Sequence, residues 1–159
     1  MNAEDLKALL NDIKNGKKDV NEAMEILKDF PYSDLGFARI DTHRELRTGY
    51  PEIVYCAGKT TEQVIAIFEF MRGRENNIIG TRMPPEMYND IAPSFPEAVY
   101  YPEARIVSIK KKDLATAPQS IAVITAGTSD IPVAEEAAIT AELLGNDVIR
   151  VYDAGVAGL

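Results

Sequence analysis

Cysteine, histidine and tryptophan are nearly absent from this chain. Its 159 residues include one cysteine, one histidine and no tryptophan. A single cysteine excludes a disulfide within the chain, which fits a reducing cytoplasm. A single histidine, His43, excludes a metal site built from several histidines and argues against a histidine-based catalytic triad. Long apolar runs are also missing, so the sequence predicts no membrane span and no secretory signal.

An excess of positive charge is missing as well. The formal net charge is −8 at pH 7, and a chain without a basic stripe does not have the pattern of a nucleic-acid-binding protein. The charge is uneven, because residues 37–82 carry a net charge of +1 and the remaining segments are acidic. The segment 37–82, with its arginines, is therefore more favourable for an anionic ligand than the acidic segments.

The apolar pattern divides the chain into three segments, namely 1–34, 35–118 and 119–159. The first predicts a helical hairpin, because apolar residues recur at helical spacing and Asp19 with Glu22 resembles a capping box. The second predicts a small α+β domain that ends in a linker over residues 110–118. Its expected helices and strands are 37–40, 52–56, 61–71, 78–79, 83–91, 98–101 and 105–109.

The third segment predicts a strand, a helix and a second strand. A buried strand over 120–125 precedes a helix over 132–144, whose alanines suit close packing on a sheet, and a strand over 147–152 follows. Such a unit is parallel and right-handed. A two-stranded parallel sheet buries too little to stand alone. We therefore expect an α/β chain that ends in the first βαβ unit of an incomplete, flavodoxin-like parallel-sheet domain.

The turn that opens this helix is the strongest candidate site. Gly127, Thr128, Ser129 and Asp130 place backbone N–H groups and two hydroxyls at a helix N-terminus, an arrangement that favours a phosphate or a carboxylate. Asp130 is the candidate catalytic group, since its carboxylate can accept a proton or contact Mg²⁺. An ordinary helix cap is the alternative, because Thr, Ser and Asp are preferred at that position.

Cationic side chains in the middle of the chain are candidate substrate ligands. Arg39, His43, Arg44 and Arg47 follow a predicted strand, and the arginine fork suits phosphates and carboxylates. An exposed helix with local ion pairs, such as Asp41 with Arg44, explains the same residues equally well. Both interpretations stay open.

Two further cations and the cysteine follow predicted strands. Lys59 lies between a strand and a helix, but a P-loop requires another glycine where Ile53 stands, so a solvated loop lysine is the alternative. Arg82 is a candidate for a ligand cleft or for a salt bridge at its rim. Cys56 has no activating base nearby in the sequence, which favours a buried apolar residue over a nucleophile.

Several separated motifs together resemble one family. They are Leu35-Gly36-Phe37-Ala38-Arg39-Ile40-Asp41, His43-Arg44, Arg47-Thr48-Gly49-Tyr50-Pro51-Glu52, Cys56-Ala57-Gly58-Lys59-Thr60, Thr81-Arg82 and Thr125-Ala126-Gly127-Thr128-Ser129-Asp130. From residue 35 onward the chain resembles the LarB family of nickel-pincer nucleotide biosynthesis. Members are pyridinium-3,5-biscarboxylic acid mononucleotide synthases, and their C-terminal domain is similar to phosphoribosylaminoimidazole carboxylase.

The resemblance implies a cytoplasmic carboxylase that acts on nicotinic acid adenine dinucleotide. Such an enzyme adds a carboxyl group from CO₂ or bicarbonate to the pyridinium ring, hydrolyses the phosphoanhydride to release AMP, and needs Mg²⁺. In the family a cysteine thiolate adds to the ring and is later expelled. The resemblance also implies that residues 127–130 face the substrate and that the full-length parent is a homo-octamer.

The chain departs from the family pattern in the C-terminal domain. The family's nucleophilic cysteine belongs to a later part of that domain, beyond Leu159, so we expect a truncated chain that is inactive by itself. We also expect it to assemble to a lower order than the octamer. The alternative function is a non-catalytic nucleotide-binding or regulatory module, which an assay of carboxylation would separate from an enzyme.

Overall fold

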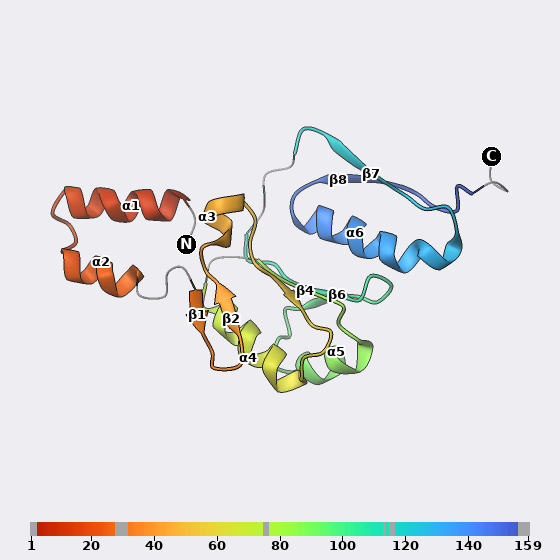
Figure 1. The fold of residues 1–159 in the computed structure, drawn as a ribbon, viewed down its shortest axis with the longest axis horizontal. Coiled ribbons are helices and arrows are strands. Elements are labelled where there is room, and N and C mark those ends of the chain that lie inside the picture. The colour runs from red at the N-terminus through yellow and green to blue at the C-terminus, as the bar shows by residue number, and fades with distance from the viewer. Residues whose placement is uncertain (1–2, 28–31, 75–76, 113, 115–116, 156–159) are drawn as a thin grey trace. The chain divides into compact units, whose positions relative to one another are not determined.

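The computed structural model describes residues 3–27, 32–74, 77–112, 114 and 117–155 (Figure 1). The chain forms two compact units, Met1–Glu52 and Ile53–Leu159. Each unit is described by itself below. The segment boundaries expected after residues 34 and 118 remain predictions.

The first unit contains a helical hairpin, a two-stranded sheet and a short helix. The hairpin consists of α1 (Ala3–Lys14) and α2 (Val20–Leu27). The amides of Asp19 and Glu22 each donate to the other residue's carboxylate at 2.8 Å, so the expected capping box is present. Three further elements complete the unit: β1 (Tyr32–Asp34), its antiparallel partner β2 (Arg39–Asp41) and α3 (Arg44–Thr48).

A four-stranded mixed sheet forms the core of the second unit. Its strand order is β3-β4-β6-β5. β3 (Ile53–Tyr55) is parallel to β4 (Ile78–Thr81), and β6 (Ile106–Ile109) is antiparallel to β4 and to β5 (Val99–Tyr101). The strands expected at 98–101 and 105–109 are therefore confirmed, and they pair as an antiparallel hairpin.

The helix α4 (Thr61–Arg72) covers one face of this sheet. It begins with a capping box, in which Thr60 and Gln63 exchange side-chain and backbone hydrogen bonds. Phe68 of α4 is fully buried and packs edge to face on Phe95, with ring centroids 5.6 Å apart. Gly80 of β4 makes room for this contact, because a Cβ there would lie 2.9 Å from Phe68 Cζ. The helix α5 (Pro85–Ile91) lies beside α4.

The helix α6 (Ile131–Leu143) lies between two sheets. Its C-terminal part packs on the four-stranded sheet through Ile139 and Leu143, and α6 also contacts β7 (Ser120–Ile124) and β8 (Asp147–Val151), as Figure 1 shows. Two of its alanines, Ala134 and Ala138, are buried, whereas Ala137 is exposed. The close packing expected of the alanines is therefore made by Ala134 and Ala138, and not by Ala137.

The strands β7 and β8 are parallel and α6 connects them, so the expected βαβ unit is confirmed. Register places Ile124 opposite Val151 on one face, where Ile124 is 66% exposed. On the other face Arg150 reaches the glutamates of α6. The expectation of a buried strand over 120–125 is wrong here, because one face of this small sheet is open. Among the described residues, no helix is long and apolar enough to cross a membrane.

Candidate functional site

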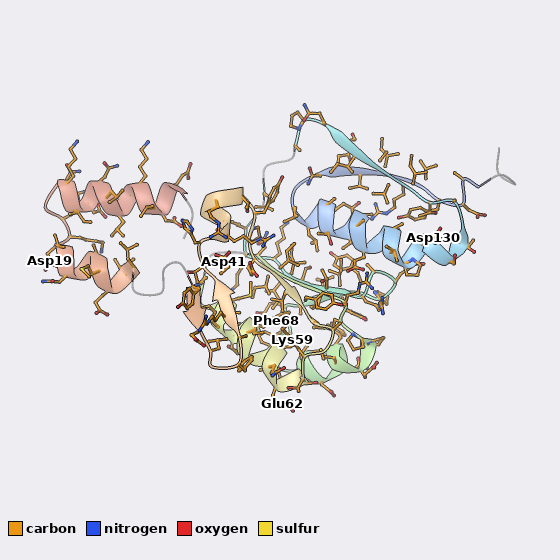
Figure 2. All side chains as sticks on the ribbon, in the orientation of Figure 1. Asp19, Asp41, Lys59, Glu62, Phe68 and Asp130 are labelled. Atoms are coloured by element: carbon orange, nitrogen blue, oxygen red, sulfur yellow. The ribbon has the colours of Figure 1, made fainter. Side chains whose placement is uncertain are left out.

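The turn after β7 forms the N-terminal end of α6. Gly127 is extended, with φ −135° and ψ 160°, and Thr128–Asp130 forms a single 3₁₀ turn. The helix then starts at Ile131, with Pro132 in its first turn. The backbone N–H groups of a first turn have no acceptor within the helix, so proline, which lacks this group, costs little there. Figure 2 shows Asp130 at this end of the helix.

The polar side chains of this turn do not cap the helix. Asp130, the residue before α6, makes no side-chain cap hydrogen bond, and Gly127, which precedes the 3₁₀ turn, has no side chain to make one. The Asp130 amide donates to the Gly127 carbonyl at 3.2 Å. Within the described part of the chain, the amides of Gly127, Thr128 and Ser129 donate to no acceptor. These N–H groups, the two exposed hydroxyls and the exposed Asp130 carboxylate are therefore available to a ligand.

The ends of β7 and β8 brace this turn. The Thr125 amide donates to the Val151 carbonyl at 3.0 Å, and the Ala154 amide donates to the Thr125 carbonyl at 2.9 Å. The Asp153 amide donates to the Thr125 hydroxyl at 3.2 Å. Thr125 is buried, so these three hydrogen bonds are shielded from water and hold the two strand ends together.

Gly155 fits this arrangement because it has no side chain. A Cβ at position 155 would lie 2.5 Å from the carbonyl oxygen of Ala126. Any other residue would therefore displace the backbone just before Gly127. The sequence indicates a turn after β8, but nothing in it reveals that this turn presses on the turn after β7.

Lys59 and Arg82 lie at the carboxyl ends of the parallel strands β3 and β4. Lys59 Nζ donates to the Tyr55 carbonyl at 2.7 Å, so this side chain is bonded to its own loop. Arg82 has a left-handed backbone, with φ 55°, and its Nε forms an ion pair with the Glu136 carboxylate of α6. The pair is not a well-directed hydrogen bond, since the buried Nε has none of acceptable geometry among the described residues. Of the two interpretations of Arg82, the structure shows the salt bridge.

The arginines of the first unit all contact carboxylates. Arg39 Nε lies 3.2 Å from Asp34, and Arg44 lies 3.8 Å from Glu52. Arg47 forms a two-pronged contact with Asp41. The expected pair of Asp41 with Arg44 is therefore wrong as an ion pair. Because α3 starts at Arg44, its first turn brings the side chain of Arg47, and not that of Arg44, to the Asp41 carboxylate.

His43 joins the contact between Asp41 and Arg47. Its amide donates to the Asp41 carboxylate at 2.9 Å, and its ring Nδ1 lies 3.0 Å from a terminal nitrogen of Arg47. Asp41, His43 and Arg47 thus form one cluster. An anionic ligand at this cluster would have to displace the Asp41 carboxylate from Arg47.

Two carboxyls near these arginines have pKa values shifted in opposite directions. Burial raises the pKa of Asp41, but hydrogen bonds from Arg47 and from the His43 amide outweigh it, and the net pKa is below the usual value. Burial raises the pKa of Glu52, and the nearby charge of Arg44 only partly opposes this effect. One oxygen of Glu52 is buried and has no hydrogen bond among the described residues.

Cys56 is a buried residue, as its sequence context predicts. Its exposed fraction is 0%. Burial raises the pKa of the thiol to about 11, although the charge of Lys59 opposes the shift. Since the thiolate is the nucleophilic form of cysteine, Cys56 is not suited to attack a pyridinium ring.

Metal-ligating side chains are scattered rather than clustered. In the described ranges, no group of three or more His, Cys, Asp and Glu side chains is placed to hold a metal ion. Asp130 and Asp153 flank the turn, but two exposed carboxylates do not make a magnesium site by themselves. The Mg²⁺ that the resemblance implies therefore stays a prediction.

Comparison with known proteins identifies the family. A family model described as LarB/PurE-like N-terminal domain matches residues 32–112. The chain belongs to the LarB family. An uncharacterized protein from Methanocaldococcus jannaschii is 31% identical over 163 residues, which cover 98% of this chain and 64% of the relative. The chain therefore spans less than two thirds of that relative's length.

Proposed function

We propose that this chain is the substrate-positioning part of a LarB-type carboxylase. The substrate of that enzyme is nicotinic acid adenine dinucleotide. Carboxylation of its pyridinium ring by CO₂ or bicarbonate, with hydrolysis of the phosphoanhydride to AMP, gives pyridinium-3,5-biscarboxylic acid mononucleotide for nickel-pincer cofactor synthesis. The observation that carries the proposal is the braced turn over residues 127–130, whose donors and carboxylate are not used by the helix.

The turn suits two roles toward such a substrate. The amides of Gly127, Thr128 and Ser129, with the two hydroxyls, bind an anionic group of the dinucleotide, because helix N-termini favour phosphates and carboxylates. Asp130 holds or moves the proton that leaves the ring when the new carboxyl group is in place. The brace formed by Thr125, Gly155 and their partners keeps both groups in a fixed geometry.

The cations contribute to binding in different ways. Arg39, Arg44 and Arg47, with His43, bind phosphate only by exchanging their present carboxylates, so their contribution depends on the substrate's own charge. Lys59 contributes long-range positive charge from its loop. Arg82 acts through Glu136, which belongs to the helix that the turn opens.

The covalent step requires a thiol other than Cys56, because this thiol is buried and its pKa is raised. We propose that a cysteine outside these 159 residues supplies it. Mg²⁺ belongs to the proposal as the ion that the resemblance implies, and no step is routed through it. The cytoplasmic location and the octamer are parts of the same proposal.

A titration of the isotope-labelled chain with nicotinic acid adenine dinucleotide tests the binding role. We expect amide NMR shifts at Gly127, Thr128 and Ser129 that saturate. Nicotinamide, which lacks phosphate, serves as the matched ligand and should leave these amides unchanged. Equal shifts with both ligands, or none with the dinucleotide, would remove the support for this turn as the anion site.

A second assay separates the enzyme from a non-catalytic nucleotide-binding module. The longest natural protein that contains these residues is incubated with the dinucleotide, Mg²⁺ and isotope-labelled bicarbonate. An enzyme releases AMP and a labelled mononucleotide, whereas a module binds the dinucleotide without either product. Binding without product would therefore favour the module.

A further inference from the structure

The second unit contains a cavity of about 330 Å³ at the C-terminal end of α6. It is distinct from the turn over 127–130, which lies at the other end of this helix. Tyr101 and Ile79 line the cavity from the sheet, and Leu143 lines it from the helix. Tyr101 and Leu143 are partly buried and pack against a buried cluster that contains Ile79. The volume falls in the range of small-molecule sites.

Hydrogen bonds of the chain itself hold the polar walls of the cavity in place. The buried Asn77 accepts at Oδ1 from the amides of residues 111 and 112, at 2.7 and 2.9 Å. At the end of α6, the Gly145 amide donates to the Glu142 carbonyl at 2.9 Å, and the Gly145 carbonyl accepts from the Ala117 amide at 2.8 Å. The walls are therefore fixed without a ligand, as in most small-molecule sites.

The charged side chains that line the cavity are already compensated. Among the described residues they are Lys110, Lys112 and Glu142. Each lysine already interacts with another group of the protein, and Arg150 holds the Glu142 carboxylate, with one contact at 3.0 Å. An ion in the cavity would lose hydration without gaining an opposite charge that is not already paired, and such a transfer is unfavourable. The lining therefore favours a neutral ligand.

Asn146 gives the cavity a neutral polar group. It lines the cavity, and its Nδ2 donates to the Ala141 carbonyl at 3.0 Å. A side-chain amide has two N–H hydrogens and a carbonyl oxygen with two lone pairs, so this hydrogen bond leaves Asn146 able both to donate and to accept. A hydroxyl or an amide of a ligand also does both, and the half-buried Asn146 is therefore suited to bind such a group.

We propose that this cavity binds a small neutral aromatic compound with one hydroxyl or amide group. The ring packs on Tyr101 and Leu143, because burial of aromatic and apolar surface is favourable. The hydroxyl or amide exchanges hydrogen bonds with Asn146. The site is a second binding site in the chain and does not depend on the proposed carboxylation.

Benzyl alcohol, benzoate and the benzylammonium ion form a matched series of probes, similar in size and different in charge. We expect benzyl alcohol to shift the amide NMR signals of Leu143, Gly145 and Asn146, with saturation in the millimolar range or tighter. Both ions should bind at least about tenfold more weakly, since neither finds an unpaired opposite charge in the cavity. Absence of saturation with benzyl alcohol, or an ion that binds as tightly as the alcohol, would overturn the proposal.

A pair of neighbouring leucines locates the binding within the cavity. Leu143→Phe should fill part of the space and weaken the binding of benzyl alcohol about tenfold. Leu144→Phe is the matched control, because Leu144 packs against the same buried cluster but does not line the cavity. If Leu143→Phe keeps full affinity, or Leu144→Phe loses as much, the assigned site is wrong.

A third variant reverses the order of the probes. Asn146→Asp places an unpaired negative charge in the cavity, so benzylammonium should then bind more tightly than benzyl alcohol. An unchanged order in the folded variant would contradict the assignment of Asn146 as the polar contact. The probe series on the unmodified chain decides the proposal by itself should a variant not fold.

Discussion

Gly155 and Ala126 are in direct backbone contact at the ends of β8 and β7. A Cβ at position 155 would lie 2.5 Å from the Ala126 carbonyl oxygen. The φ angle of Gly155 is not positive, so close approach, not a left-handed conformation, requires glycine here. This contact connects the turn after β8 to the turn that carries the proposed anion site.

The first prediction concerns this contact. Gly155→Ala should destabilise the protein by roughly 1–3 kcal/mol, the usual cost of overpacking, and weaken dinucleotide binding. Gly127→Ala is the matched control, because a Cβ at 127 would have its nearest neighbours at 3.9 Å. Urea unfolding of both variants measures the difference. An unchanged stability of Gly155→Ala would show that the two turns are not in contact.

The ion pair between Arg82 and Glu136 gives the second prediction. Arg82→Gln and Glu136→Gln should each lower stability, and the double variant should lose less than the sum of the two. This follows because each single variant leaves the other charge without its partner. Asp12 and Lys17, an exposed pair at 4.0 Å, serve as the control and should show no coupling. Additive losses at Arg82 and Glu136 would mean that the pair is not formed in solution.

Opposite pH dependence at Asp41 and Glu52 is the third prediction. The pKa of Asp41 is lowered in the fold, so its contribution to stability is present above the usual pKa and is lost as the pH falls through the folded value. The pKa of Glu52 is raised, so its contribution is present at acid pH and is lost as the pH rises through the folded value.

Site-specific titration by carboxyl-carbon NMR measures both values. Asp41→Asn should cost stability at neutral pH, whereas Glu52→Gln should have little effect or stabilise there, because it removes a partly buried charge. A Glu52 pKa below the usual value would contradict the burial of its carboxyl.

The fourth prediction concerns Cys56. With a pKa of about 11, about one thiol in ten thousand is ionised at pH 7. We expect no alkylation of the native chain over hours and complete alkylation in denaturant. In the longest natural protein that contains these residues, Cys56→Ser should keep most of the activity. A folded but inactive Cys56→Ser variant would show that Cys56 takes part in the chemistry.

The sequence predicts the elements whose signal is local. The capping boxes at Asp19 and Thr60, the β5–β6 hairpin and the βαβ unit were all readable because periodicity and cap residues lie within a few positions of each other. β1 was missed and β2 was expected two residues early, since three-residue strands are too short to show alternation.

The rest depends on contacts between residues distant in the sequence. Glu136 as the partner of Arg82, and Gly155 as the neighbour of Ala126, follow from how α6 and the strand ends pack, and no local pattern reports them. The choice of Arg47 over Arg44 as the partner of Asp41 depends on where the short helix α3 begins. The strand, the small-residue turn and the helix start around the candidate turn were predicted from sequence because they lie together, and its role as a site stays a prediction.

The most direct test of the account is the carboxylation rate of Asp130→Asn, measured in the longest natural protein that contains these residues. Asp130 makes no cap hydrogen bond, so the variant should change the free energy of unfolding by less than about 0.5 kcal/mol. Asp90→Asn, at an exposed position of α5, is the matched control. We predict that Asp130→Asn lowers the rate about a hundredfold or more, the usual effect of losing an acid–base group, while Asp90→Asn does not. An unchanged rate in Asp130→Asn would contradict the catalytic role assigned to this turn.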